Sequence, residues 1–168
     1  MKTLKKIFAI LVIAISACPV FAGCNGSAGQ TPPTGQTPPE NQQPVQEEVT
    51  KMYLTVNGNK LEVALAENSS VDALVGILKQ GDVTFTADEN GGFEIYGDIG
   101  HSLPTNNTHL TAQAGDVFLY AGRYLCFFFG SNSYSYTEIG KIKGYSASEL
   151  RTLLGANQGS VQVTVSLN

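Results

Sequence analysis

The chain has 168 residues, 42% of them hydrophobic, a formal net charge of −4 at pH 7 and no tryptophan. Three of the ten basic residues lie within the first six positions, whereas all fourteen acidic residues follow Cys24, so the part after Cys24 carries about −7. No cluster of Lys or Arg is present in the sequence to follow a phosphate backbone, so we do not expect a nucleic-acid partner.

Residues 1–23 have the pattern of an export signal. Lys2, Lys5 and Lys6 precede an apolar run at 7–17 that is too short to cross a bilayer stably as a helix. A cysteine after small residues at the end of such a signal resembles the lipobox of bacterial lipoproteins, in which that cysteine carries the lipid. The pattern predicts a lipid-anchored protein at the cell envelope, whose partner is the membrane.

Two cysteines are candidates for the lipidated position. The segment before Cys18 matches the lipobox pattern more closely, but cleavage there would leave an apolar stub at 19–22. Cys24 opens directly onto a polar Asn-Gly-Ser segment, so we favour Cys24 and keep Cys18 as the alternative. Ordinary cleavage after Ala22 would instead give a secreted protein with a free thiol.

Residues 24–49 are rich in Pro, Gln, Gly, Ser, Thr and Glu, and Thr-Pro-Pro occurs twice. Such a segment buries too little apolar surface to offset its ordering entropy, which predicts a disordered tether. The rest, 50–168, is long enough for one domain with a single core.

The predicted domain opens with a hairpin, because residues 52–56 and 61–65 alternate around Asn57-Gly58, a type I′ turn signal. A helix is predicted to start at Ser69, since apolar residues then follow with helical spacing. A second helix follows the capping box that begins at Ser146, and Gly155 is placed to end it. Further strands are predicted at 83–87, 93–96, 117–120, 125–129 and 161–165, with turns at 91–92 and 121–122. This pattern predicts a mainly β fold, an antiparallel barrel or sandwich with helical caps.

The later half of the chain resembles cyclophilins, and the stretch from about Lys51 resembles the small bacterial cyclophilin-like proteins. The shared features are the hairpin, a Glu-Asn pair before the first helix, Ser-Leu-Pro-Thr at 102–105, Gly-Asp at 115–116 and Ser-Tyr-Ser-Tyr-Thr-x-Ile-Gly at 133–140. The resemblance implies a cyclophilin-like closed eight-stranded β-barrel capped by two short helices.

The resemblance does not imply prolyl isomerase activity. Active isomerases of this fold carry an arginine in a Phe-His-Arg context and an aromatic groove wall that often includes tryptophan. The corresponding stretch, 93–97, is Phe-Glu-Ile-Tyr-Gly, so the arginine is missing. That arginine would donate to the prolyl nitrogen and weaken the amide resonance of the twisted transition state. We therefore predict no catalytic residues and keep a divergent peptidyl-prolyl isomerase as the alternative.

Other reactive side chains indicate no chemistry. Cys126 lies in a predicted apolar strand, and we interpret it as a small core residue. His101 and His109 are placed in a long polar loop without the spacing of metal ligands, so neither a metal nor another cofactor is expected.

Ser133, Tyr134, Ser135 and Tyr136 form the most distinctive run of the chain. In an extended strand the two tyrosines point to one side, where their rings and the interleaved hydroxyls would line a groove for a peptide or a sugar. Phe93, Tyr96 and His101 are weaker candidates for the same groove. The other interpretation is that the tyrosines close one end of the barrel and bond to loop carbonyls. The sequence thus predicts an envelope-anchored, non-catalytic binding or structural module with an unidentified peptide or saccharide ligand.

Overall fold

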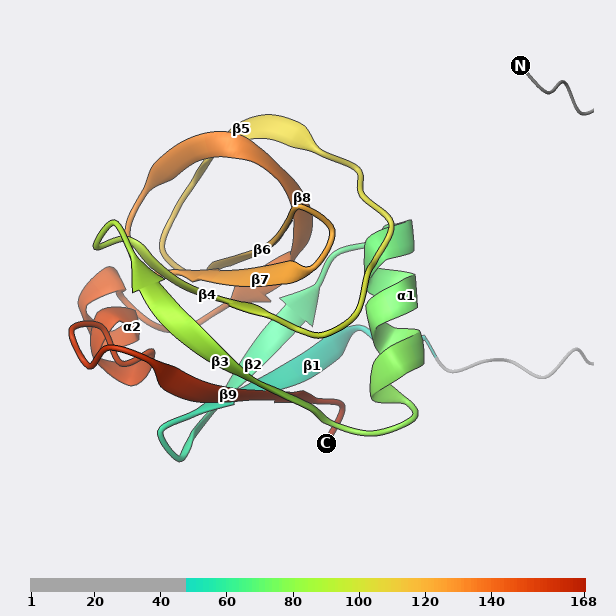
Figure 1. The fold of residues 1–168 in the computed structure, drawn as a ribbon, viewed down its shortest axis with the longest axis horizontal. Coiled ribbons are helices and arrows are strands. Elements are labelled where there is room, and N and C mark those ends of the chain that lie inside the picture. The colour runs from blue at the N-terminus through green and yellow to red at the C-terminus, as the bar shows by residue number, and fades with distance from the viewer. Residues whose placement is uncertain (1–47) are drawn as a thin grey trace, which may run out of the picture. The chain divides into compact units, whose positions relative to one another are not determined.

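The fold is that of a computed structural model, which describes residues 48–168 (Figure 1). The predicted export signal, both candidate lipidation cysteines and the predicted tether up to position 47 lie outside the described residues. Within the described part, no helix is long and apolar enough to cross a bilayer.

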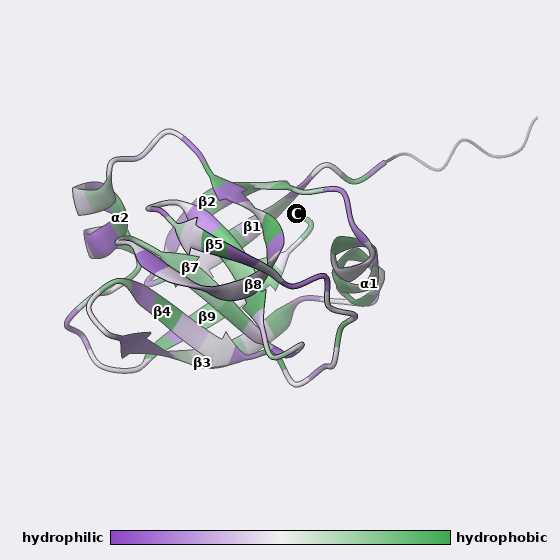
Figure 2. Ribbon diagram, turned by 90° about the horizontal axis from the view of Figure 1, so that it is seen from above, coloured by the Kyte–Doolittle hydropathy of each residue, from purple (hydrophilic) through white to green (hydrophobic). Residues whose placement is uncertain are grey.

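The described residues form a mainly β domain with two helices, as predicted. Its strands are β1 (Lys51–Val56), β2 (Asn59–Leu65), β3 (Val83–Asn90), β4 (Glu94–Asp98), β5 (Thr108–Ala112), β6 (Asp116–Tyr120), β7 (Tyr124–Phe128), β8 (Asn132–Ile142) and β9 (Val161–Ser166). Its helices are α1 (Ser69–Leu78) and α2 (Ala147–Leu153). The helices lie on opposite sides of the strands in both Figure 1 and Figure 2.

Eight strands close into a ring in the order β2-β1-β9-β3-β4-β7-β6-β8, and β8 pairs back with β2. Each of these pairings is antiparallel. β5 stands apart from the ring because its pairing partner is the first half of β8. Closure of the ring leaves few unpaired strand edges, which would otherwise be sites of aggregation.

Local sequence signals account for the turns and helix ends. Asn57 and Gly58 both have positive φ, as a type I′ turn requires, and so do Ala121 and Gly122 between β6 and β7. The Ser146 hydroxyl accepts a hydrogen bond from the backbone N–H of Glu149, and the backbone N–H of Ser146 donates to the Glu149 carboxylate, which confirms the predicted capping box. The first helix begins at Ser69, as predicted, and the side chain of Asn68 caps it by accepting hydrogen bonds from the backbone of Ser70 and Val71.

The main hydrophobic core fills the ring. Alternate residues of each strand point inward, among them Ile95 of β4, Leu119 of β6 and Phe127 of β7, all with no exposed surface. Figure 2 shows this alternation as bands of hydrophobic and hydrophilic colour along the strands.

A second, smaller cluster lies on the outer face of β4, β6 and β7. It is covered by an arm, which we define as β5 together with residues 132–136 of β8, and Figure 1 shows this arm curving over β6 and β7. The space beneath it is filled by Ala112, Phe118, Cys126, Phe128 and Tyr136. The outer face of this part of the sheet is therefore buried as well.

One local prediction was wrong. His109 was expected in a loop, but it lies on β5, where it pairs with Ser135 of β8. The alternation that marks a half-buried strand is weak in β5, whose residues are mostly exposed. Its strand character comes from pairing with the arm segment of β8.

Candidate functional site

A pocket of about 250 Å³ opens at the edge of the arm, and we call it the tyrosine pocket. Four of the seven tyrosines of the chain line it, together with two asparagines, a glutamate and a cysteine. Its lining residues are Asn90, Glu94, Tyr96, Tyr120, Cys126, Asn132, Tyr134 and Tyr136.

Strand alternation brings these side chains together. Residues of β4 and β7 that point away from the ring core lie opposite one another, so Tyr96 pairs with Cys126 and Glu94 with Phe128. Glu94 also pairs with Asn90 across the β3–β4 turn. The arm contributes Asn132, Tyr134 and Tyr136, which alternate along the first half of β8.

Glu94 is the chemically unusual member of the pocket. Its side chain is 3% exposed, and its Oε1 accepts a 2.8 Å hydrogen bond from Nδ2 of Asn90. Its Oε2 has no hydrogen-bond partner, and among the described residues it is the one buried side-chain nitrogen or oxygen in that condition. A buried polar atom without a hydrogen-bond partner lowers the stability of a protein by about 1–3 kcal/mol, and by more when it is charged. The unpaired Oε2 therefore needs a physical explanation.

The pKa of Glu94 reflects this environment. Burial raises the pKa of the carboxyl above its ordinary value, while the amide of Asn90 and the nearby thiol of Cys126 partly oppose the rise. The thiol is close enough to perturb the carboxyl, although no hydrogen bond joins it to Oε2. The proton on Glu94 is therefore held to a higher pH than on a solvated glutamate.

The other two buried titratable groups stay neutral. Burial raises the pKa of the Cys126 thiol well above its ordinary value, and the neighbouring Glu94 adds to the effect. A thiol with a raised pKa is a poor nucleophile, which agrees with the reading of Cys126 as a core residue. Burial also raises the pKa of Tyr136 to about 12, and the hydrogen bond from Asn132 opposes this only in part.

The tyrosine rings form one connected wall. The ring centroids of Tyr120 and Tyr134 are 5.7 Å apart, and those of Tyr134 and Tyr136 are 5.6 Å apart. Tyr136 is 4% exposed and stacks on Phe118, whereas Tyr134 is 50% exposed at the pocket mouth. One tyrosine of the predicted pair thus anchors the wall, and the other faces solvent.

The structure brings together only some of the predicted groove residues. Tyr134, Tyr136 and Tyr96 line the tyrosine pocket. Ser133 and Ser135 alternate with the tyrosines and are exposed, and the Ser133 hydroxyl bonds to Thr111 of β5. These two serines are not among the residues that line the pocket.

Phe93 and His101 also lie outside the pocket lining. Phe93 stacks on Phe128 with ring centroids 6.1 Å apart and supports the second cluster. His101 is exposed in the segment after β4. The hydroxyl of Tyr136 accepts a hydrogen bond from the side chain of Asn132, which lies on the same strand. The interpretation that the tyrosines close the barrel expected a loop carbonyl as the partner instead.

Sequence reasoning missed Glu94, Tyr120, Asn90 and Asn132. A usable signal was present for Glu94, because it occupies an outward position of a short strand between apolar neighbours. Its burial depends on the arm, however, and the arm is formed by pairing of β5 with β8, which the local pattern does not indicate.

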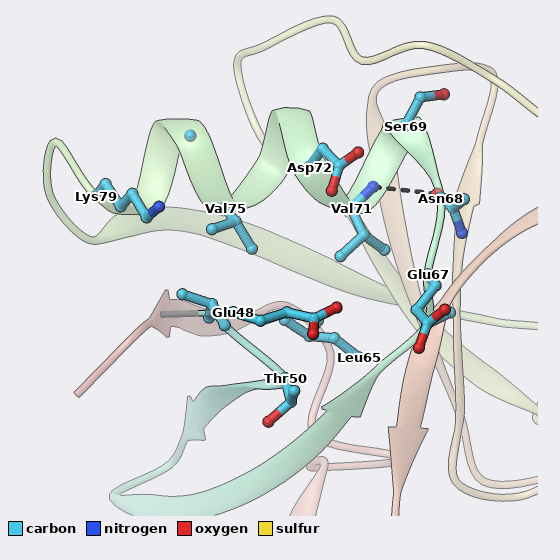
Figure 3. A pocket seen from close by; sticks show the side chains of 13 residues that line it. Glu48, Thr50, Leu65, Glu67, Asn68, Ser69, Val71, Asp72, Val75 and Lys79 are labelled. Atoms are coloured by element: carbon cyan, nitrogen blue, oxygen red, sulfur yellow. Dashed lines mark hydrogen bonds between the residues drawn. The ribbon is translucent and has the colours of Figure 1, made fainter. Parts of the chain in front are cut away.

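A larger cleft, of about 800 Å³, lies between α1 and the segments at 48–50, just before β1, and 65–68, at the end of β2 (Figure 3). In Figure 3 the side chains of Val71 and Val75 point from the helix toward Glu48 and Leu65 on the other wall. Its charged lining residues are exposed, and it contains no buried unpaired polar atom. Because its chemistry is that of an open surface, we consider the tyrosine pocket the stronger candidate site.

Among the described residues, none that lines the tyrosine pocket is basic. The nearby Arg123 forms an ion pair with Asp98, with Nη2 and Oδ2 2.5 Å apart, and this pair lies at the far end of β4. Among residues 48–168, no three His, Cys, Asp or Glu side chains converge in a way that would hold a metal ion.

Comparison with known proteins supports the fold. The solution structure of a hypothetical protein from Archaeoglobus fulgidus is 20% identical, with a TM-score of 0.55 over 74% of this chain and 99% of that chain. At this identity the likeness concerns the fold alone. No curated protein matches the sequence significantly. A family model described as the cyclophilin-like family matches residues 54–166, nearly the whole described domain, and the chain therefore belongs to the cyclophilin-like family.

Proposed function

We propose that this protein is a non-catalytic binding module of the cell envelope, held there by an N-terminal lipid, and that the tyrosine pocket receives its ligand. The observation that carries the proposal is the unpaired, buried Oε2 of Glu94 within a pocket walled by four tyrosines. A purely structural module would gain stability from filling this pocket, because a buried polar atom without a partner is destabilising.

The size of the pocket limits what it holds. At about 250 Å³ it is slightly smaller than the roughly 300–1,000 Å³ of pockets that enclose a whole small molecule. It therefore takes one residue of a longer ligand, such as a peptide side chain or a sugar ring. Both groups suit aromatic walls with polar atoms at the base.

The binding proposal is tested with residues 25–168, which lack the export signal and Cys24, on one array of extended peptides and one of oligosaccharides. Tyr134→Ala removes an exposed wall of the pocket. Tyr145→Ala is the matched control, because Tyr145 is 42% exposed and lies outside the pocket lining. We expect array signals that Tyr134→Ala weakens at least about tenfold and Tyr145→Ala preserves.

An equal response of the two variants would remove the pocket from the proposal. The same three proteins are assayed for prolyl isomerisation, where we expect the uncatalysed background rate. A rate above background that falls in Tyr134→Ala would replace the binding module with a divergent isomerase.

The lipid anchor is a separate part of the proposal and has its own test. Incorporation of labelled palmitate is compared between the full chain, Cys24→Ala and Cys18→Ala. We expect the label and membrane association to be lost in Cys24→Ala and retained in Cys18→Ala. Loss in Cys18→Ala alone would move the anchor to Cys18, and absence of label in the full chain would favour a secreted protein.

A further inference from the structure

Within residues 48–168, no positively charged side chain pairs with the buried carboxyl of Glu94. Its polar neighbour Asn90 is uncharged, and its Oε2 is unpaired. The arginines of the described domain pair elsewhere: Arg123 with Asp98, and Arg151 with Glu89 and the carbonyl of Gly92. The pocket thus contains a buried carboxyl group without a cationic partner, which is unusual because buried carboxylates are normally paired.

The walls of the same pocket are built from aromatic rings of the kind that attract organic cations. The faces of tyrosine rings carry negative potential and attract a cation within about 6 Å, with more effect where water is excluded. Tyr120, Tyr134 and Tyr136 contact one another at centroid distances of 5.6 to 6.5 Å, and Tyr96 contributes a fourth ring from β4. Quaternary ammonium groups are typical ligands of such aromatic cages.

We infer that the tyrosine pocket binds the ammonium end of an organic cation, with Glu94 as its counter-charge, an inference that rests on the binding function proposed above. The ammonium group supplies the charge that Glu94 lacks, and its methylene or methyl groups contact the tyrosine rings. Two sources share this chemistry: the side chain of a lysine in a peptide, and a choline-type headgroup.

The pH dependence of binding follows from the groups that face Glu94. These are Asn90 from β3, Tyr96 on β4, Tyr120 from β6, Cys126 from β7, and Tyr136 from β8, with Asp88 of β3 opposite Tyr96. Cys126 and Tyr136 stay neutral because their pKa values are raised. Asp88 is exposed and hydrogen-bonded to Ser160. Affinity for a cation is therefore expected to increase as the pH rises through the raised pKa of Glu94, because the carboxyl must lose its proton to act as counter-charge.

The test titrates residues 25–168 with four small probes and follows the fluorescence of the tyrosines, since the chain has no tryptophan. Choline is compared with 3,3-dimethylbutan-1-ol, in which carbon replaces the charged nitrogen. N-acetyl-lysine amide is compared with N-acetyl-norleucine amide. We expect at least one ammonium probe to bind about tenfold or more tightly than its neutral counterpart.

Two variants assign the effect to the pocket. Glu94→Gln is expected to abolish the pH dependence and to reduce the preference for the charged probe to the part that the tyrosine rings supply. Tyr134→Ala is expected to weaken the ammonium probe, and the control Tyr145→Ala to leave it unchanged. Preference for choline over the lysine probe, or the reverse, identifies the source of the cation.

The inference is overturned if the neutral probes bind as tightly as the charged ones, or if affinity falls as the pH rises. Either result would mean that Glu94 acts as a protonated donor to a neutral ligand, and the binding module would stand. Absence of binding by all four probes also overturns the inference. In that case the peptide and oligosaccharide arrays test the proposed function separately: signals that Tyr134→Ala weakens would still support a binding module.

Discussion

At the scale of single residues, the defining feature is that Glu94 and Cys126 share the outer face of β4 and β7 with aromatic residues. On an uncovered sheet such an outward glutamate would be solvated and ordinary. Here the arm buries it, and the pKa of its carboxyl is raised in consequence. Another glutamate, on α2, behaves in the opposite way: the backbone and side chain of Ser146 lower the pKa of Glu149 by hydrogen bonding.

This contrast gives a prediction for stability against pH. Folded Glu94 binds its proton more tightly than the unfolded chain does, so the free energy of unfolding falls as the pH rises from the ordinary value of 4.5 through the raised pKa. Glu94→Gln removes this loss. We expect the variant to gain stability relative to the parent as the pH rises from 4.5 through the raised pKa of Glu94, measured by urea unfolding.

Glu149→Gln serves as the control with the opposite sign. The pKa of Glu149 is lowered in the folded state, so its contribution is present above the ordinary value and is lost as the pH falls through the lowered pKa. The variant should therefore be less stable than the parent at neutral pH, and the difference should shrink in acid. Parallel pH profiles of Glu94→Gln and the parent would show that Glu94 is solvated in the folded protein.

At the scale of elements, a helix or strand could be predicted from the sequence where the residues that determine it are close together in the chain. The opening hairpin was predicted because Asn57-Gly58 determines its turn, and α2 because its capping box is contained within four residues. β5 was missed, and His109 with it, because that strand is held by pairing with β8 across more than twenty residues. The spacing of Tyr134 and Tyr136 was enough to identify them as candidates. Glu94 could not be identified in the same way, because its burial depends on the arm.

Glycines provide a matched pair of predictions for two elements. Gly76 lies in α1 with helical backbone, and a Cβ built there meets nothing within 4 Å. Gly76→Ala should raise the free energy of unfolding by about 0.5–1 kcal/mol, because alanine loses less backbone entropy in a helix. Gly140 lies in β8, where a Cβ would collide with the carbonyl oxygen of Ala64 on β2.

Gly140→Ala should therefore lower the free energy of unfolding by about 1–3 kcal/mol, since the neighbouring atom is rigid backbone. Urea unfolding of both variants beside the parent tests the pair. Equal effects of the two substitutions would mean that β8 and β2 do not approach as closely as the pairing of Gly140 with Leu65 requires.

At the scale of the whole molecule, the main core lies in the ring, and the arm helps to form the pocket that we propose as the binding site. The ring encloses the main core, and the arm makes a second layer on one outer face. The pocket lies where the second layer ends, so its walls come from five different strands. This arrangement keeps the site outside the main core, and substitutions at the exposed Tyr134 are expected to change binding without unfolding the ring.

The ring also determines where the chain can be shortened. Thr50 is held because its carbonyl accepts a hydrogen bond from Leu65, so a chain that begins at Glu48 keeps every contact of β1. We expect it to unfold at the same urea concentration as residues 25–168, as followed by circular dichroism. A lower midpoint would show that the preceding segment contributes to the fold.

A chain that begins at Asn57 should not fold. It lacks β1, which joins β2 to β9, and with it the side chains of Met52, Leu54 and Val56, none of which has exposed surface. Each buried side chain of this kind contributes about 1.5–3 kcal/mol, whereas a whole domain has a net stability of about 5–15 kcal/mol. Opening the ring also exposes the edges of β2 and β9, so the expected product is unfolded or aggregated protein. A cooperative unfolding transition in this truncated chain would mean that the ring does not need to close for the domain to be stable.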